Sequence, residues 1–150
     1  MTYLKLSLIG ALLASGAAAD GARTALNPST VPDSRQYGYS QANIVRAQTD
    51  MVYVAGQVGI SADGPNDFET QVDRSFDNML AVLAAAGAGA EDVVKITLLI
   101  SDHDPAKLAY LVKKRRAVFG DAPPASTLIP VTRLYADGVD FEIDAVAVLD

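Results

Sequence analysis

Apolar residues recur along this chain with two different periods, one typical of helices and one of strands. From residue 68 they recur every three or four residues, as on one face of an α-helix: Phe68, Val72, Phe76, Met79, Leu80 and Leu83. This spacing predicts a helix that begins near Asn66 or Asp67. Gly87 and Gly89 follow the last apolar position and are expected to end it.

A second amphipathic helix is predicted after Asp104-Pro105. Asp104 can cap the first turn, and proline suits the first helical position because it lacks an N–H that would be unpaired there. Gly120 is expected to end this helix. The positions that mark one face of this helix are Leu108, Leu111, Val112, Arg115 and Phe119, four apolar residues and one arginine.

The remaining periodic segments are rich in strand-forming residues. Segments 42–46 and 51–55 are predicted to form a β-hairpin around residues 47–50. An additional short strand is expected within the extended segment 20–37, which contains turn-forming residues.

Three further strands are predicted in the second half of the chain. Val93–Ile100 places Val94, Ile96, Leu98 and Ile100 on one face. Strands over 125–134 and 139–149 are separated by a turn at 135–138. The element order predicts an α+β fold, with a single mixed β-sheet and two helices packed on one face. Since two helices cover one face only, we expect the other to be covered by oligomerisation.

The first nineteen residues have the pattern of a cleavable secretory signal peptide. Lys5 provides a positively charged n-region, and residues 6–14 form a short apolar run. The small residues Ala17-Ala18-Ala19 provide a cleavage site before Asp20. The apolar run is too short to span a membrane. The alternative interpretation is a buried N-terminal helix. The pattern predicts an exported protein, periplasmic or secreted and free of the membrane after cleavage, with residues 20–150 as its one domain.

Composition excludes several classes of site. The 150-residue chain has no cysteine, which excludes disulfides and thiolate metal sites, and a single histidine, His103. A Ser-His-Asp triad or multi-histidine metal centre would depend on that one ring, which stands between Asp102 and Asp104 and is interpreted as part of a helix-capping turn. The formal net charge of −6 disfavours nucleic-acid binding, which relies on lysine and arginine contacts to phosphate.

Two charged clusters are candidate sites. The run 113–116, Lys-Lys-Arg-Arg, falls in the last turns of the second predicted helix and is interpreted as a solvated face, with an anion or RNA contact as the alternative. Glu142 and Asp144 share one face of a predicted strand. They are either a solvent-facing pair or part of a cleft in which Glu142 handles a proton.

Five segments in order carry a resemblance to a known family. They are Tyr39-Ser-Gln-Ala42, Val52-Tyr-Val-Ala-Gly-Gln57, Ala86-Gly-Ala88 before Asp92-Val-Val-Lys95, Pro124-Ala-Ser-Thr-Leu128, and Phe141-Glu-Ile-Asp-Ala-Val-Ala-Val148. Over residues 27–149 the chain resembles the RidA/YjgF family, also called the reactive-intermediate deaminase or perchloric-acid-soluble-protein family. The resemblance implies a chorismate-mutase-like fold. It also implies a homotrimer whose sheets face inward as a barrel, with small-molecule clefts between subunits.

The resemblance also implies a chemistry. Active members hydrolyse enamines and imines derived from amino acids to ammonia and a 2-oxo acid, without metal or organic cofactor. Glu142 corresponds to the family glutamate that holds the attacking water and is the predicted catalytic residue. Tyr39 corresponds to a tyrosine lining the cleft, and Gly56 to the glycine whose backbone approaches the ligand.

Other predicted substrate-binding positions depart from the family pattern. Ser126 stands where the family has a carboxylate-binding arginine, Ala55 where active members often have serine, and Leu128 where they often have cysteine; Thr127 lies between. Serine cannot make the bidentate contact of arginine, and losing such a clamp on a buried carboxylate costs about 3–5 kcal/mol. Arg133, seven residues after Ser126, is expected on the opposite strand face and is a poor substitute.

These observations leave three hypotheses. The first is a deaminase of reactive enamines or imines with altered substrate choice because of Ser126. The alternative is a non-catalytic trimeric protein that binds a small molecule. The third is an endoribonuclease, which the acidic charge and the single histidine disfavour.

Overall fold

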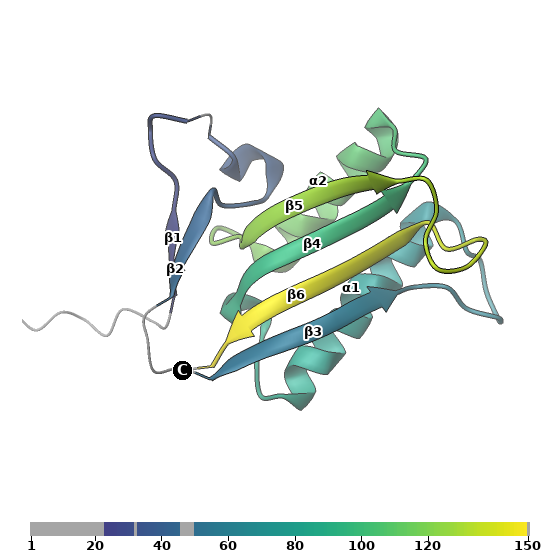
Figure 1. The fold of residues 1–150 in the computed structure, drawn as a ribbon, viewed down its shortest axis with the longest axis horizontal. Coiled ribbons are helices and arrows are strands. Elements are labelled where there is room, and N and C mark those ends of the chain that lie inside the picture. Colours follow the sequence, from purple (N-terminus) through teal and green to yellow (C-terminus); the bar gives the residue numbers. More distant parts are fainter. Residues whose placement is uncertain (1–22, 32, 46–49, 150) are drawn as a thin grey trace, which may run out of the picture.

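Two helices pack on one face of a four-stranded sheet in the computed structural model, which describes residues 23–31, 33–45 and 50–149 (Figure 1). This arrangement confirms the predicted α+β class. The signal peptide predicted over residues 1–19 lies outside the described residues and stays a prediction.

The four-stranded sheet is mixed, in the order β3, β6, β4, β5. Strand β6 (Phe141–Val148) lies between β3 (Met51–Val58) and β4 (Val93–Ser101) and is antiparallel to both. At the edge, β5 (Ala125–Val131) runs parallel to β4. Parallel neighbours need a long crossover, and the second helix supplies it.

Both helices begin where the sequence predicts. Helix α1 (Phe68–Ala85) is capped by Asp67, whose side chain accepts a 3.0 Å hydrogen bond from the Thr70 backbone N–H. Helix α2 (Pro105–Phe119) is capped by Asp104, which accepts a 2.7 Å bond from the Lys107 N–H. Over the described part of the chain, neither helix is long and apolar enough to cross a membrane.

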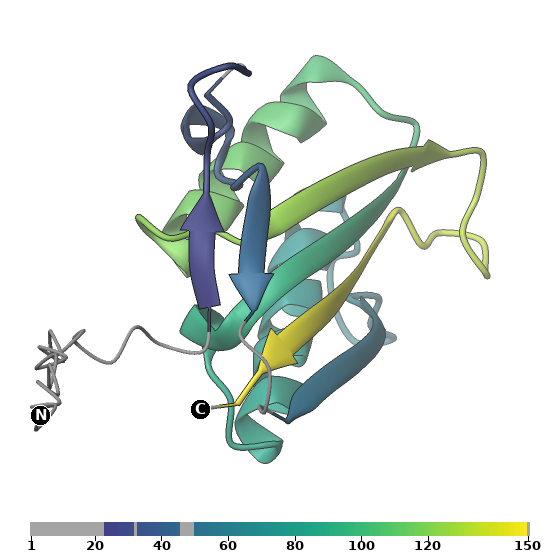
Figure 2. The ribbon, with the colours of Figure 1, turned by 60° about the vertical axis from the view of Figure 1, so that its left-hand side comes forward.

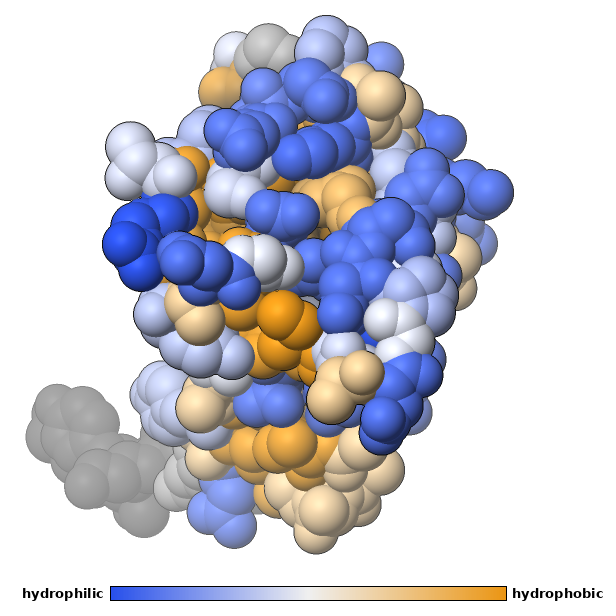
Figure 3. Space-filling model, turned by 90° about the vertical axis from the view of Figure 1, so that its right-hand side faces the viewer, coloured by the Kyte–Doolittle hydropathy of each residue, from blue (hydrophilic) through white to orange (hydrophobic). Residues whose placement is uncertain are grey.

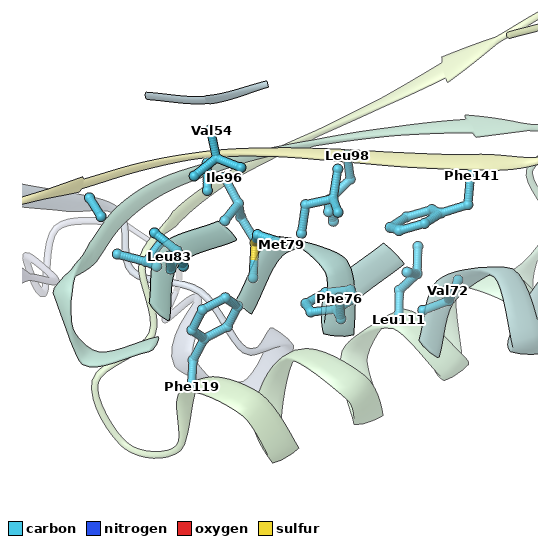
Figure 4. Packing of buried hydrophobic residues seen from close by; sticks show 14 of the residues in the cluster. Val54, Val72, Phe76, Met79, Leu83, Ile96, Leu98, Leu111, Phe119 and Phe141 are labelled. Carbon is cyan, nitrogen blue, oxygen red and sulfur yellow. The ribbon is translucent and has the colours of Figure 1, made fainter. Parts of the chain in front are cut away.

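The hydrophobic core fills the space between the helices and the sheet (Figure 4). The Phe76 ring of α1 stacks on the Phe141 ring of β6, with centroids 6.2 Å apart and planes within 8°. The predicted apolar stripes supply most of this core. Its fully buried members include Val72, Phe76, Met79, Leu83, Ile96, Leu98, Ile100, Leu111, Phe141 and Ile143.

The predicted hairpin between segments 42–46 and 51–55 is wrong. Strand β2 (Ala42–Val45) pairs instead with β1 (Arg23–Leu26), in a separate two-stranded antiparallel sheet, whereas β3 pairs with β6 (Figure 2). Asn43 helps to hold β2 beside β4, because its side-chain amide donates a 3.0 Å hydrogen bond to the Val94 carbonyl. Strand-forming composition identified the strands, but a partner distant in sequence decided the pairing.

The last two strands are shorter than predicted. Strand β5 ends at Val131 and β6 begins at Phe141, so residues 132–140 form a longer connection. Gln71 of α1 accepts a 2.9 Å hydrogen bond from the Asp140 N–H and so fixes the end of this connection. The side of the molecule where these loops lie, on the right in Figure 1, is mainly hydrophilic, with smaller apolar areas between the polar residues (Figure 3).

Candidate active site

Strand β6 divides its side chains between the two faces of the sheet. Phe141 and Ile143 are fully buried beneath the helices, whereas Glu142 and Asp144 alternate with them and are partly exposed. Since successive residues of a strand point to opposite faces, Glu142 lies on the face away from the helices. We call this side of the sheet the open face.

Glu142 lies against a glycine of the neighbouring strand. The register of β3 on β6 shifts between Val54 and Gln57, so Ala55 and Gly56 lie at a bulge-like irregularity in the strand pairing. A Cβ at Gly56 would overlap Glu142 Oε1 and lie 2.7 Å from its Cδ. The carboxylate can therefore occupy this place only because residue 56 has no side chain. Glu142, Gly56 and Ala55 form what we call the carboxylate half-site.

A pocket of about 230 Å³ lies between α2 and β5, on the helix-covered face. Ser126 and Leu128 of β5 lie beside Ile96 and Leu98 of β4, whose side chains are fully buried under the helices. Neighbours in register share a face, so Ser126 and Leu128 point toward α2. The residues that line this α2–β5 pocket are Tyr37, Tyr39, Leu108, Val112, Arg115, Ser126 and Leu128.

Tyr39 reaches this pocket because the segment before β2 is tied to the start of β5. The Ser40 N–H donates a 2.9 Å hydrogen bond to the Pro124 carbonyl, and its hydroxyl donates a 2.6 Å bond to the Pro123 carbonyl. Gly38, with a φ of 74°, makes the turn just before Tyr39. Two consecutive prolines favour extended backbone at the entry to β5, which suits this pairing.

Arg115 is the site residue that the sequence analysis missed. Its side chain is 3% exposed, its Nη1 donates a 3.1 Å hydrogen bond to Ser126 Oγ, and its guanidinium lies 5.8 Å from the centre of the Tyr39 ring. Burial lowers the pKa of Arg115 from its ordinary value, but arginine stays protonated at neutral pH. The sequence feature that could have indicated this role is the occurrence of a charged residue, Arg115, within the predicted apolar stripe of α2.

The interpretation of residues 113–116 as a solvated face holds for Lys113 and Arg116, which are exposed, and is wrong for Arg115. Arg115 points into the protein, and the half-buried Lys114 pairs with Asp73 of α1 at 3.0 Å. Consecutive helix positions point in different directions, so a run of four cations divides among different environments.

Three other candidate residues lie outside the α2–β5 pocket. Thr127 points to the open face, where its hydroxyl accepts a hydrogen bond from Lys95 Nζ. Arg133 lies beyond the end of β5, exposed, with Asp137 3.6 Å away. His103 is exposed in the turn before α2, and the described residues contain no group of three or more potential metal-ligating side chains.

The predicted site residues thus fall into two groups on opposite faces of the sheet. Tyr39, Ser126 and Leu128 share the α2–β5 pocket, whereas Glu142, Gly56 and Ala55 share the open face. Strand β4 separates β5 from β6. A single copy of the chain therefore does not bring both groups to one small molecule.

Comparison with known proteins gives consistent matches over most of the chain. The family model described as endoribonuclease L-PSP matches residues 32–149. The chain is 31% identical to the 2-iminobutanoate/2-iminopropanoate deaminase of Escherichia coli K12 over 107 residues, 66% of this chain and 80% of that protein.

Two solved structures are similar as well. YyfB of Yersinia pestis, a Rid-family protein, is 32% identical and aligns with a TM-score of 0.80 over 85% of this chain and 99% of that one. E. coli TdcF with bound serine is 29% identical, with a TM-score of 0.59 over 75% of this chain and 88% of that one.

Proposed function

This chain belongs to the RidA/YjgF family, and we propose that it is a cofactor-independent hydrolytic deaminase of imines or enamines derived from amino acids, with Glu142 as its catalytic residue. The observation that carries the proposal is the packing of Glu142 against Gly56, which leaves room for a carboxylate on the open face. The deaminase name of a relative that aligns over two thirds of the chain supports it.

The proposed reaction needs one group that moves a proton. Water adds to the imine carbon while Glu142 takes a proton from that water, and the proton is then delivered to nitrogen. The product of this addition is a carbinolamine, and its hydroxyl proton is then transferred to nitrogen as well. The C–N bond breaks with its electron pair going to nitrogen, ammonia leaves, and the former hydroxyl oxygen becomes the carbonyl oxygen. A positioned carboxylate contributes about 10²–10⁴-fold to such proton transfers.

We propose that the working form is a homotrimer with its ligand in a cleft between subunits. The carboxylate half-site of one copy would then meet the α2–β5 pocket of another. Apolar side chains on the open face support this assembly, because Met51, Tyr53 and Ile129 are 47%, 71% and 41% exposed there. Light scattering should give three times the subunit mass. Tyr53→Glu should reduce it to that of one folded subunit, whereas Tyr135→Glu, in a loop, should leave it unchanged.

The substrate choice is proposed to differ from that of relatives with arginine at the position of Ser126. A serine at this place cannot itself bind a carboxylate in bidentate fashion. The part of the substrate that arginine contacts in those relatives must therefore be recognised by a different side chain in this protein.

The test is ammonia release from imines generated in situ by an amino-acid oxidase. We expect Glu142→Gln to lower the rate by about 10²–10⁴-fold. Asp144→Asn, two residues along the same strand face, is the matched control and should stay close to wild type. Wild-type protein with no rate above buffer would overturn the proposal, as would an unimpaired Glu142→Gln variant.

The two alternatives give different results in the same set of assays. Thermal stabilisation by a small ligand without turnover would indicate the binding protein. RNA cleavage that Glu142→Ala abolishes would indicate the ribonuclease, although the net charge of −6 disfavours RNA as a substrate.

A further inference from the structure

A buried guanidinium borders the α2–β5 pocket without a carboxylate partner among the described residues. Arg115 is 3% exposed, and its one hydrogen bond there goes to the neutral hydroxyl of Ser126. Its Nε is buried and has no acceptor in the described part of the chain. By contrast, the neighbouring Lys114 pairs with Asp73 of α1.

Such an arrangement is unfavourable in an empty pocket. A guanidinium has five N–H donors, and a buried charge without an opposite charge costs several kcal/mol. The Tyr39 ring and the Ser126 hydroxyl fix the position of the Arg115 side chain but bring no negative charge. An anionic ligand in the pocket would supply both the missing charge and the missing acceptors.

We propose that Arg115 binds the carboxylate of the substrate in the α2–β5 pocket, and that Ser126 orients its guanidinium. The anion-binding group then comes from α2 rather than from β5. This inference rests on the proposed function for the reaction, and it adds the side chain that recognises the free carboxylate of the imino-acid substrate. Leu108, Val112 and Leu128 make the pocket walls partly apolar, which suits a small aliphatic side chain.

The first test uses wild-type protein and a stable product analogue. Isothermal calorimetry would compare 2-oxobutanoate with its neutral primary amide, which has the same carbon skeleton. We expect the acid to bind at least tenfold more tightly, because only the acid pairs with the guanidinium. Equal affinity for the two compounds would overturn the proposal.

Variants then assign the effect to Arg115. Arg115→Gln should lose at least tenfold in affinity for the acid while binding the amide as wild type does. Arg133→Gln removes an exposed guanidinium and is the matched control, expected to bind both compounds normally. If thermal melting shows that Arg115→Gln does not fold, Ser126→Ala replaces it, and a selective loss of acid binding is expected there too. Unchanged acid affinity in the folded variant would contradict the proposal.

The design separates this inference from the proposed function. Binding of the 2-oxo acid is measured without turnover, so acid-selective binding through Arg115 in a protein that releases no ammonia would support the inference and refute the deaminase. Conversely, an active deaminase whose Arg115→Gln variant keeps its kcat/KM on imino acids would refute the inference alone.

Discussion

The two faces of the four-stranded sheet are built by alternate residues of the same strands, yet they differ in almost every property. On the helix-covered face, Phe141 is fully buried and stacks on Phe76. On the open face, its neighbour Glu142 is partly exposed beside a glycine, and Tyr53 is 71% exposed.

This difference shows how one small domain separates its stacked core rings from the proposed catalytic carboxylate. The covered face excludes water and supplies most of the hydrophobic free energy of folding, because the chain's own helices bury it. The open face retains a carboxylate and exposed apolar groups that the described part of the chain does not cover. Substitution of the core rings should therefore change the free energy of unfolding, whereas substitution beside Glu142 should change activity.

The largest expected effect is on the covered face. Phe141→Ala should lower the free energy of unfolding by about 3–5 kcal/mol, because it leaves a cavity beside Phe76 and removes a stacked ring pair. Urea unfolding followed by circular dichroism measures this. Tyr135→Ala, at a position 68% exposed, is the control and should change stability by less than about 0.5 kcal/mol. Similar losses in both variants would contradict the central place of Phe141 in the core.

An intermediate effect is expected on the open face, in activity rather than stability. Gly56→Ala would place a Cβ where Glu142 Oε1 now lies, so the carboxylate must move. Ammonia release should fall by about a hundredfold, within the range that a misplaced proton-transfer group costs. Gly64→Ala is the matched control, because its Cβ would meet only the flexible end of Arg74. A fully active Gly56→Ala protein would show that the position of this carboxylate does not matter.

The smallest expected effect concerns the two helices that cover the sheet. The Tyr110 hydroxyl of α2 donates a 2.9 Å hydrogen bond to Asp73 of α1, and burial together with this bond raises the pKa of Tyr110 to about 12. Since the folded protein holds the phenolic proton more tightly than the unfolded chain, the resulting stability is present below pH about 10. It is lost as the pH rises from about 10 to 12.

Tyr110→Phe removes this group and should make the decline in stability between pH about 10 and 12 shallower. The change should stay below about 1 kcal/mol, because solvent screens a partly exposed group. Thermal melting across this pH range measures it. An unchanged pH profile would mean that Tyr110 keeps its ordinary pKa in the folded protein.

The sequence by itself determined the local elements. The three- and four-residue spacing of apolar residues predicted a helix that begins near Asn66 or Asp67, and Asp104-Pro105 predicted the start of the second; the observed helices begin at Phe68 and Pro105. These features depend on interactions within one or two turns, which a sequence displays directly. The alternation in Phe141–Val148 likewise predicted that Glu142 and Asp144 share the face opposite Phe141 and Ile143.

Only the tertiary structure decided which elements meet. Strand β2 joins β1 rather than β3, because pairing depends on contacts between segments distant in the chain. Arg115 occupies the apolar stripe of α2, but only the approach of β5 and Tyr39 shows that its charge is buried beside a pocket. The sequence pattern names the side chains on each face of an element, whereas packing decides what each face touches and therefore what chemistry it can perform.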